Sequence, residues 1–186
     1  MPLHYDIDLK NFIDIQEYFS KYVNKDLIGQ SITVFDKTDN DTIWLQEKII
    51  DDIFGIFLED PKIKICVLGG LSGNESLRVH MDGHNPPTPD QHWALNIPIF
   101  NCEDTKMYWY DNNYNIGYAT PTNKPNLPAD DSQHLRPIWI GNPKVIDECS
   151  IDKPKFVKVT TPHSVTNFSK RPRYLLSVRF NIATNL

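Results

Sequence analysis

The stretch Arg173-Tyr174-Leu175-Leu176-Ser177-Val178-Arg179-Phe180 alternates regularly along its length. Side chains two residues apart on a β-strand point to the same side of a sheet. One side of such a strand is apolar here, as a core face requires, and consists of Tyr174, Leu176, Val178 and Phe180. The other side carries Arg173, Leu175, Ser177 and Arg179. The stretch therefore predicts a strand that presents two guanidinium groups and a hydroxyl on its second face.

Other strand-like runs lie upstream, with Gly, Pro and Asn between them. They cover residues 63–68, 76–81, 93–100, 106–110, 136–140 and 155–160, and the last run extends over 173–181. Many short strands separated by turn residues are typical of a β-sandwich or barrel. The sequence has no internal repeat and no change that marks a boundary. We therefore expect a single domain over 1–186, with its β-core in 61–186.

Residues 1–60 have a helical periodicity instead. Apolar residues recur at helical spacing over 9–22 and again over 44–58. Such stripes indicate burial of one helix face. We expect amphipathic helices here that cover a core.

The composition is that of a globular protein, with 40% hydrophobic and 11% aromatic residues in a chain of 186. The net charge of −5 is spread along the chain without a basic block, which argues against nucleic acid and membrane surfaces as partners. The first residues show no signal-peptide pattern. Three cysteines without metal-type spacing fit a reducing, cytoplasmic setting.

The triplet His80-Met81-Asp82 follows one of the predicted strands. Its first and third side chains can converge on one ion, because residues i and i+2 of a strand share a side. Gly83 then lets the chain turn away. A second triplet, His4-Tyr5-Asp6, lies at a terminus expected to fray, so we interpret His4 as a surface residue. The sequence thus favours His80 and Asp82 as metal ligands.

A third ligand is expected from another part of the chain. His163 follows a predicted strand, and Pro162 fixes the backbone just before it. The other histidines lie past a turn or at loop ends: His84, His92 and His134. We therefore take His163 as the third ligand. Two imidazoles and one carboxylate are the ligand set of a non-haem Fe(II) facial triad.

The polar face of the last strand indicates an acidic ligand. Guanidinium groups are costly to bury without partners. A dicarboxylate cosubstrate would satisfy Arg173 or Arg179 through a bidentate contact, and Ser177 could add a hydrogen bond.

Four motifs together resemble the Fe(II)/2-oxoglutarate-dependent dioxygenases: the triplet at 80–82, the strand at 93–99, the turn Thr161-Pro162-His163-Ser164-Val165-Thr166-Asn167 and the strand at 173–180. Within that family they are most similar to small aspartyl/asparaginyl β-hydroxylase-like members. The resemblance covers about two-thirds of the chain, from residue 63 to 180.

The resemblance implies a fold and a reaction. The fold is mainly β with flanking α: a double-stranded β-helix (jelly roll, cupin-like) with N-terminal helices that buttress one sheet. Fe(II) is expected on His80, Asp82 and His163, with 2-oxoglutarate and O2 as cosubstrates. The basic residue for the distal carboxylate lies ten positions past the second His in that family, which favours Arg173 over Arg179. The expected activity is hydroxylation of a peptide side chain, an amino acid or another small metabolite, with release of succinate and CO2.

Secondary contacts with the cosubstrate are predicted from strand alternation. Asn96 lies opposite the apolar face of its strand. Tyr108 and Tyr110 lie opposite Met107 and Trp109, and either hydroxyl could meet 2-oxoglutarate. An ordinary structural hydrogen bond is the alternative for each of them.

The segment 112–133 is rich in Pro, Asn, Asp and Thr and is long for a loop. It is interpreted either as a lid or as a surface insertion. Two other functions stay open. One is a non-oxidative metal cupin, such as an isomerase, with His84 or His92 as a further ligand. The other is a catalytically inactive jelly-roll binding module.

Overall fold

The alternating stretch forms β11 (Arg173–Phe180), a central strand of the larger sheet in the computed structural model of the chain. It pairs antiparallel with β3 (Ile63–Leu71) on one side and with β4 (Trp93–Phe100) on the other. The sheet has the order β1-β9-β4-β11-β3-β2. Its remaining members are β9 (Lys155–Lys158) and the edge strands β1 (His4–Asp6) and β2 (Ser31–Asp36). The structure describes residues 2–23, 31–82, 92–111, 113–118 and 135–186.

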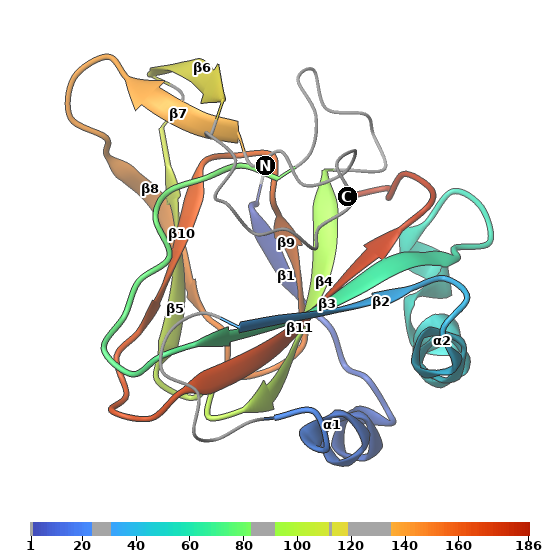
Figure 1. The fold of residues 1–186 in the computed structure, drawn as a ribbon. Coiled ribbons are helices and arrows are strands. Elements are labelled where there is room, and N and C mark those ends of the chain that lie inside the picture. The colour runs from blue at the N-terminus through green and yellow to red at the C-terminus, as the bar shows by residue number, and fades with distance from the viewer. Residues whose placement is uncertain (1, 24–30, 83–91, 112, 119–134) are drawn as a thin grey trace.

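A second, smaller sheet faces the first (Figure 1). It has the order β10-β5-β8 and is formed by β5 (Thr105–Tyr110), β8 (Val145–Ser150) and β10 (His163–Asn167). The segment 76–80 runs antiparallel beside β10, to which it is joined by the bridges Ser76↔Thr166 and His80↔His163. This segment therefore acts as a fourth strand, although the structure shows only isolated bridges where the sequence predicted a strand.

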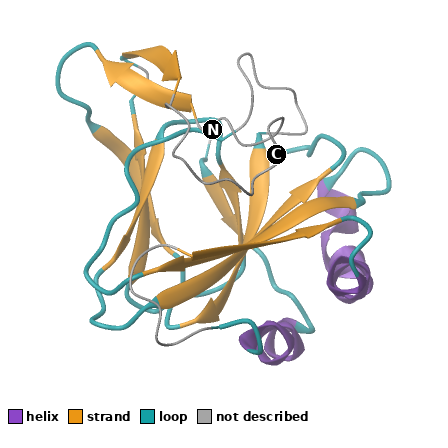
Figure 2. Ribbon diagram, in the orientation of Figure 1, coloured by secondary structure: helices purple, strands orange, loops and turns teal. Residues whose placement is uncertain are grey.

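The path of the chain defines the fold. From β3 onward the chain crosses from one sheet to the other at each step, except from β5 to β8, which are neighbours in the smaller sheet. The order β9-β4-β11-β3 thus faces the order β8-β5-β10 followed by segment 76–80. This arrangement is a double-stranded β-helix, or jelly roll, which confirms the predicted fold. Strands predominate and the helices lie outside the sheets (Figure 2).

An antiparallel ribbon is inserted between β5 and β8. It consists of β6 (Tyr114–Tyr118) and β7 (Leu135–Trp139) and projects at the top of Figure 1. The part of the predicted lid that the structure describes is therefore a strand. The rest of that prediction, residue 112 and residues 119–133, lies outside the described residues.

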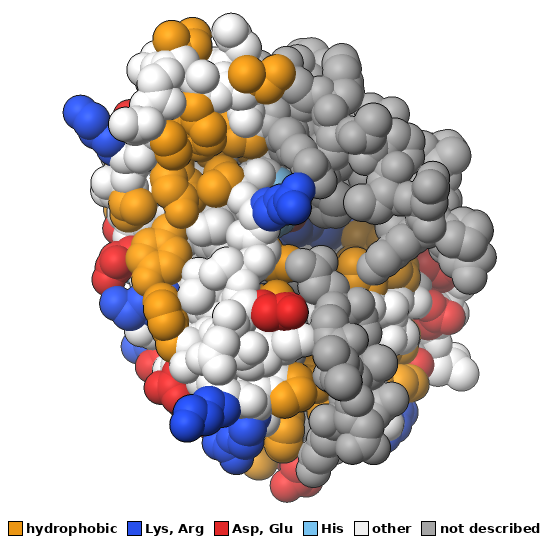
Figure 3. Space-filling model, turned by 60° about the vertical axis from the view of Figure 1, so that its left-hand side comes forward, with side chains coloured by type: hydrophobic (Ala, Val, Ile, Leu, Met, Phe, Trp, Pro, Cys, Tyr) orange, Lys and Arg blue, Asp and Glu red, His pale blue; other side chains and the backbone are white. Residues whose placement is uncertain are grey.

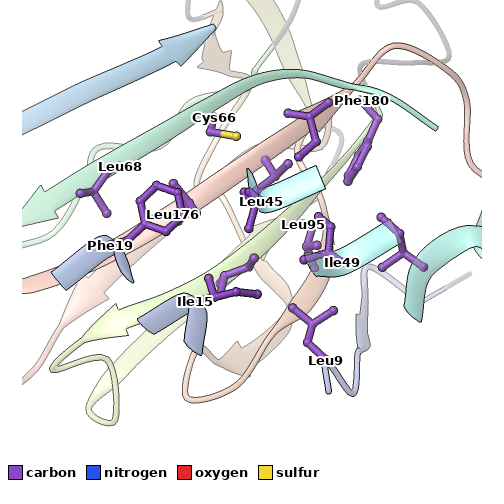
Figure 4. Packing of buried hydrophobic residues seen from close by; sticks show 14 of the residues in the cluster. Leu9, Ile15, Phe19, Leu45, Ile49, Cys66, Leu68, Leu95, Leu176 and Phe180 are labelled. Carbon is purple, nitrogen blue, oxygen red and sulfur yellow. The ribbon is translucent and has the colours of Figure 1, made fainter. Parts of the chain in front are cut away.

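The helices cover the outer face of the larger sheet. The elements are α1 (Phe12–Ser20), α2 (Asn40–Ile53) and the short 3-10 helix η1 (Phe54–Ile56). Their buried stripes, including Ile15, Phe19, Leu45 and Ile49, pack with Leu176 in one apolar core (Figure 4). Helical periodicity predicted this role correctly. It did not reveal the two edge strands, β1 and β2, that the same 60 residues also supply.

A second apolar core fills the space between the sheets. The larger sheet contributes Ala94, Val157 and Leu175, and the smaller one contributes Met107, Trp109 and Val165, among others. Because Leu175 lies in this core, the face of β11 that carries Arg173, Ser177 and Arg179 is the inner face of the jelly roll. No helix among the described residues has both the length and the apolar character needed to cross a membrane.

The three cysteines are free and buried in the two cores. Burial raises the pKa of the Cys66 and Cys149 thiols to about 12 and also raises the pKa of Cys102. Because thiolates are the reactive species, we expect the native chain to react very slowly with a thiol reagent at pH 8. All three thiols should react at once in denaturant. Fast labelling of any thiol in the native chain would contradict this packing.

Candidate metal centre

Two backbone hydrogen bonds bring the predicted histidines side by side. The His80 N–H donates to the His163 carbonyl at 3.0 Å, and the His163 N–H donates to the His80 carbonyl at 2.9 Å. Residues paired in this way in an antiparallel sheet project to the same side. Their imidazole centroids are 4.4 Å apart. The two histidines are far apart in the sequence, and the bridge between segment 76–80 and β10 brings them together.

Asp82 completes the group. Its backbone N–H donates to the Val159 carbonyl at 2.9 Å, which holds the chain beside the end of β9. One ligand atom from each of His80, Asp82 and His163 lies within 4.8 Å of the others. Among the described residues, this is the one cluster of His, Cys, Asp and Glu side chains with metal-binding geometry. The structure therefore brings together the three residues that the sequence predicted as ligands.

Backbone carbonyls fix how both imidazoles can bind a metal ion. His80 Nδ1 lies 2.8 Å from the Arg78 carbonyl, and His163 Nδ1 lies 2.9 Å from the Thr161 carbonyl. A carbonyl only accepts, so Nδ1 carries the proton in both rings and Nε2 keeps its lone pair. Metal-ligating histidines are commonly anchored in this way. Neither anchor is visible in the sequence, because each depends on the local backbone path.

His163 is buried, with 3% of its surface exposed. Burial and the neighbouring His80 lower its pKa to about 3. The ring is therefore neutral at physiological pH, which is the form that binds metal ions.

The two oxygens of Asp82 have different surroundings. Oδ1 lies 3.5 Å from His80 Nε2, on the side of the imidazoles. Oδ2 accepts a hydrogen bond from Arg179 Nη2. Two Nε2 atoms and one carboxylate oxygen on one side of a site leave further coordination positions open, so the residues fit a facial-triad metal such as Fe(II).

Arg173 lies on the inner face of the larger sheet, at the opposite end of β11 from Arg179. It is buried, with 3% of its surface exposed. Its Nε atom has no hydrogen-bond partner among the described residues, and no carboxylate in that part of the chain forms an ion pair with it. Burial lowers the pKa of its guanidinium. A buried cation in this state calls for an anionic partner.

Asn96 of β4 and Ser177 of β11 are register partners, so their side chains lie side by side on the inner face of the larger sheet. Asn96 is buried, and its Oδ1 atom has no hydrogen-bond partner among the described residues. Both side chains thus line the wall between the two arginines. In the middle of one face of the molecule, Lys or Arg side chains lie at the rim and inside of a recess (Figure 3).

Tyr108 and Tyr110 lie on the outer face of β5, away from this site. β5 buries Met107 and Trp109 inward, and Trp109 is in register with His163. The tyrosines alternate with them and face outward, where the Tyr110 hydroxyl is 3.0 Å from Ser164 Oγ. The prediction that either hydroxyl meets the cosubstrate does not agree with this placement. The alternation in the sequence showed two faces but not which one was the inner face.

The remaining histidines are not in the described cluster. His4 stacks on Trp109 at 5.6 Å between ring centroids, and His92 offers its carbonyl to the Val159 N–H. His84 and His134 lie outside the described residues.

Asn167 is a buried residue to which the sequence analysis gave no role. Its side-chain amide donates to the carbonyls of Leu71, Ser72 and Arg171 at 3.3, 3.1 and 2.8 Å. Leu71 is the register partner of Arg173. Asn167 therefore joins the ends of β10 and β3 to the turn that leads into Arg173. It lies four positions after His163, a distance of about 13 Å along β10.

Comparison with solved structures finds similar folds at low identity. The X-ray structure of E. coli ycfD has a TM-score of 0.45 and 10% identity, and the match covers 88% of this chain and 37% of that one. Oxalate decarboxylase from Bacillus subtilis at pH 4.6 has a TM-score of 0.41 and 10% identity, covering 89% and 29%. Vicilin from hazelnut, Corylus avellana, has a TM-score of 0.41 and 6% identity, covering 85% and 30%.

The chain thus spans well under half the length of these proteins. No protein-family model and no curated protein matches it. Similarity at this level carries no information about activity, which has to be argued from the site itself.

We expect Asn167→Ala to lower the free energy of unfolding by about 1–3 kcal/mol, because three buried or partly buried carbonyls lose the Asn167 amide as a donor. Urea denaturation measures the loss. The matched control is Asn113→Ala, whose exposed amide donates to the Ile140 carbonyl alone. That change should stay within about 0.5 kcal/mol. Equal losses for the two variants would show that Asn167 does not fix this end of the jelly roll.

Proposed function

We propose that the chain is an Fe(II)- and 2-oxoglutarate-dependent oxygenase that hydroxylates a C–H bond of a peptide side chain, an amino acid or another small metabolite. The observation that carries the proposal is Arg173: a guanidinium buried on the inner face of the jelly roll without a carboxylate partner among the described residues. A metal triad alone suits many reactions. A triad together with a buried cation on the facing sheet suits a metal-bound dicarboxylate.

Different residues bind the two ends of such a cosubstrate. His80 Nε2, His163 Nε2 and Asp82 Oδ1 hold the metal at one end of the inner space. Arg173 binds the distal carboxylate at the other end through a bidentate contact. Asn167 stabilises the turn that precedes Arg173, so the cation is held in place before the ligand arrives.

Ser177 and Asn96 lie between these ends on the wall of the larger sheet. A hydroxyl and an amide there can donate hydrogen bonds to carboxylate oxygens. Leu175 and the apolar core around it border the same space. Apolar surroundings strengthen the contacts between charged groups.

Bound iron supplies the oxidising chemistry. In the overall reaction, O2 and 2-oxoglutarate give succinate and CO2 while one oxygen atom enters a C–H bond of the substrate. The protein orients the partners of this reaction and excludes side reactions. The net charge of −5 without a basic block makes nucleic acid a poor candidate for the substrate.

The test is the visible spectrum of the chain under anaerobic conditions. Fe(II) plus 2-oxoglutarate should give a weak charge-transfer band, and Arg173→Ala should abolish it because the distal carboxylate loses its cation. The matched control is Arg171→Ala, which removes an exposed guanidinium two residues away and should keep the band. The absence of a band in the unmodified chain would rule out the oxygenase.

Succinate formation with iron, ascorbate and 2-oxoglutarate separates an enzyme from an inactive binding module. An oxygenase produces it, whereas a chain that only binds the cosubstrate shows the band and no succinate.

A further inference from the structure

Arg173 and Arg179 lie on the same face of β11, six residues apart, but have different partners. Arg173 has no ion-pair partner among the described residues, whereas Arg179 Nη2 donates to Asp82 Oδ2. Both members of this pair are largely buried, with about a fifth of each side chain exposed. The sequence predicted Arg179 as a second contact for the cosubstrate. The structure instead places it against Asp82, a candidate metal ligand.

The pair uses only one oxygen of Asp82. Oδ2 is taken by the guanidinium, while Oδ1 is 3.5 Å from His80 Nε2. The ion pair therefore does not cover the atom that faces the imidazoles. It fixes the rotation of the carboxylate about its last bond and engages the second oxygen.

We propose that Arg179 is a positioning residue that fixes Asp82 as a single-oxygen ligand of the metal ion. The inference rests on the proposed metal centre and goes beyond its three ligands. A carboxylate without such an anchor can rotate or bind through both oxygens. Two-oxygen binding would occupy a position that the cosubstrate and O2 need.

Two effects of Arg179 on metal affinity oppose each other. Its positive charge repels a divalent ion, which weakens binding. Its hydrogen bond holds the carboxylate in the binding geometry, which strengthens binding. Hydrogen-bond partners of metal ligands typically contribute roughly 10–100-fold to metal affinity. The guanidinium contacts the Asp82 oxygen that does not face the imidazoles, so its charge lies farther from the ion than the ligand oxygen does. We therefore expect the positioning effect to be the larger one.

The experiment measures the binding of Mn(II) alone, without 2-oxoglutarate, from the EPR signal of the free ion. Arg179→Met should weaken binding roughly 10–100-fold. Arg179→Lys, which keeps the charge and one donor, should lose less. The crossed control is Arg173→Met on the same strand face, which should leave Mn(II) binding unchanged and weaken only 2-oxoglutarate binding. Thermal unfolding of the metal-free variants verifies that each one folds.

A double-mutant cycle with Asp82→Asn tests whether Arg179 acts through the carboxylate. If it does, Arg179→Met adds no further loss of Mn(II) affinity in that background. Equal losses in both backgrounds would overturn the role, as would a folded Arg179→Met chain that binds Mn(II) as well as or better than the unmodified one. Failure of the unmodified chain to bind Mn(II) would overturn the metal centre itself, which is a separate result.

Discussion

The candidate site depends on the reciprocal backbone hydrogen bonds between His80 and His163. These bonds add segment 76–80 to the smaller sheet and place two imidazoles on one side of it. The ligand atom of Asp82 then lies within reach of both rings. A backbone carbonyl lies within hydrogen-bond distance of each Nδ1 atom, that of Arg78 for His80 and that of Thr161 for His163. The fold therefore sets the tautomer that binds a metal through Nε2. The sheet therefore provides position and protonation state together.

β11 imposes a second constraint, since its inner face carries a cation at each end. The two cations differ in their partners. Arg179 is neutralised by Asp82, whereas Arg173 is buried without such a partner in the described chain. Leaving a guanidinium in this state costs stability, and an anionic ligand offsets the cost when it binds. The strand thus joins the candidate metal end of the inner space to an end where a buried cation calls for an anion. This is the basis for our proposal of a dicarboxylate that spans both ends.

Much of the fold could be predicted, because its strands are short apolar or alternating runs between turn residues. β5 alternates in burial, β4 and β11 are buried on both faces and appear as mainly apolar runs, and the helical stripes of α1 and α2 are equally plain. β8 was missed because its side chains are mostly exposed, so no apolar pattern marks it. The ligands could be proposed because the strand setting singles out the His80-Met81-Asp82 triplet and a second histidine follows another predicted strand. The Arg179–Asp82 pair, the Asn167 contacts and the outward placement of Tyr108 and Tyr110 could not, since each depends on which strands become neighbours and which face turns inward.

The most direct measurement is anomalous diffraction from crystals grown anaerobically with Fe(II) and 2-oxoglutarate. The account predicts one metal peak about 2.0–2.2 Å from the Nε2 atoms of His80 and His163 and from one oxygen of Asp82. 2-Oxoglutarate should extend from the metal toward Arg173. A metal held by His84 or His92 in place of His163, or no metal between these three residues, would contradict it.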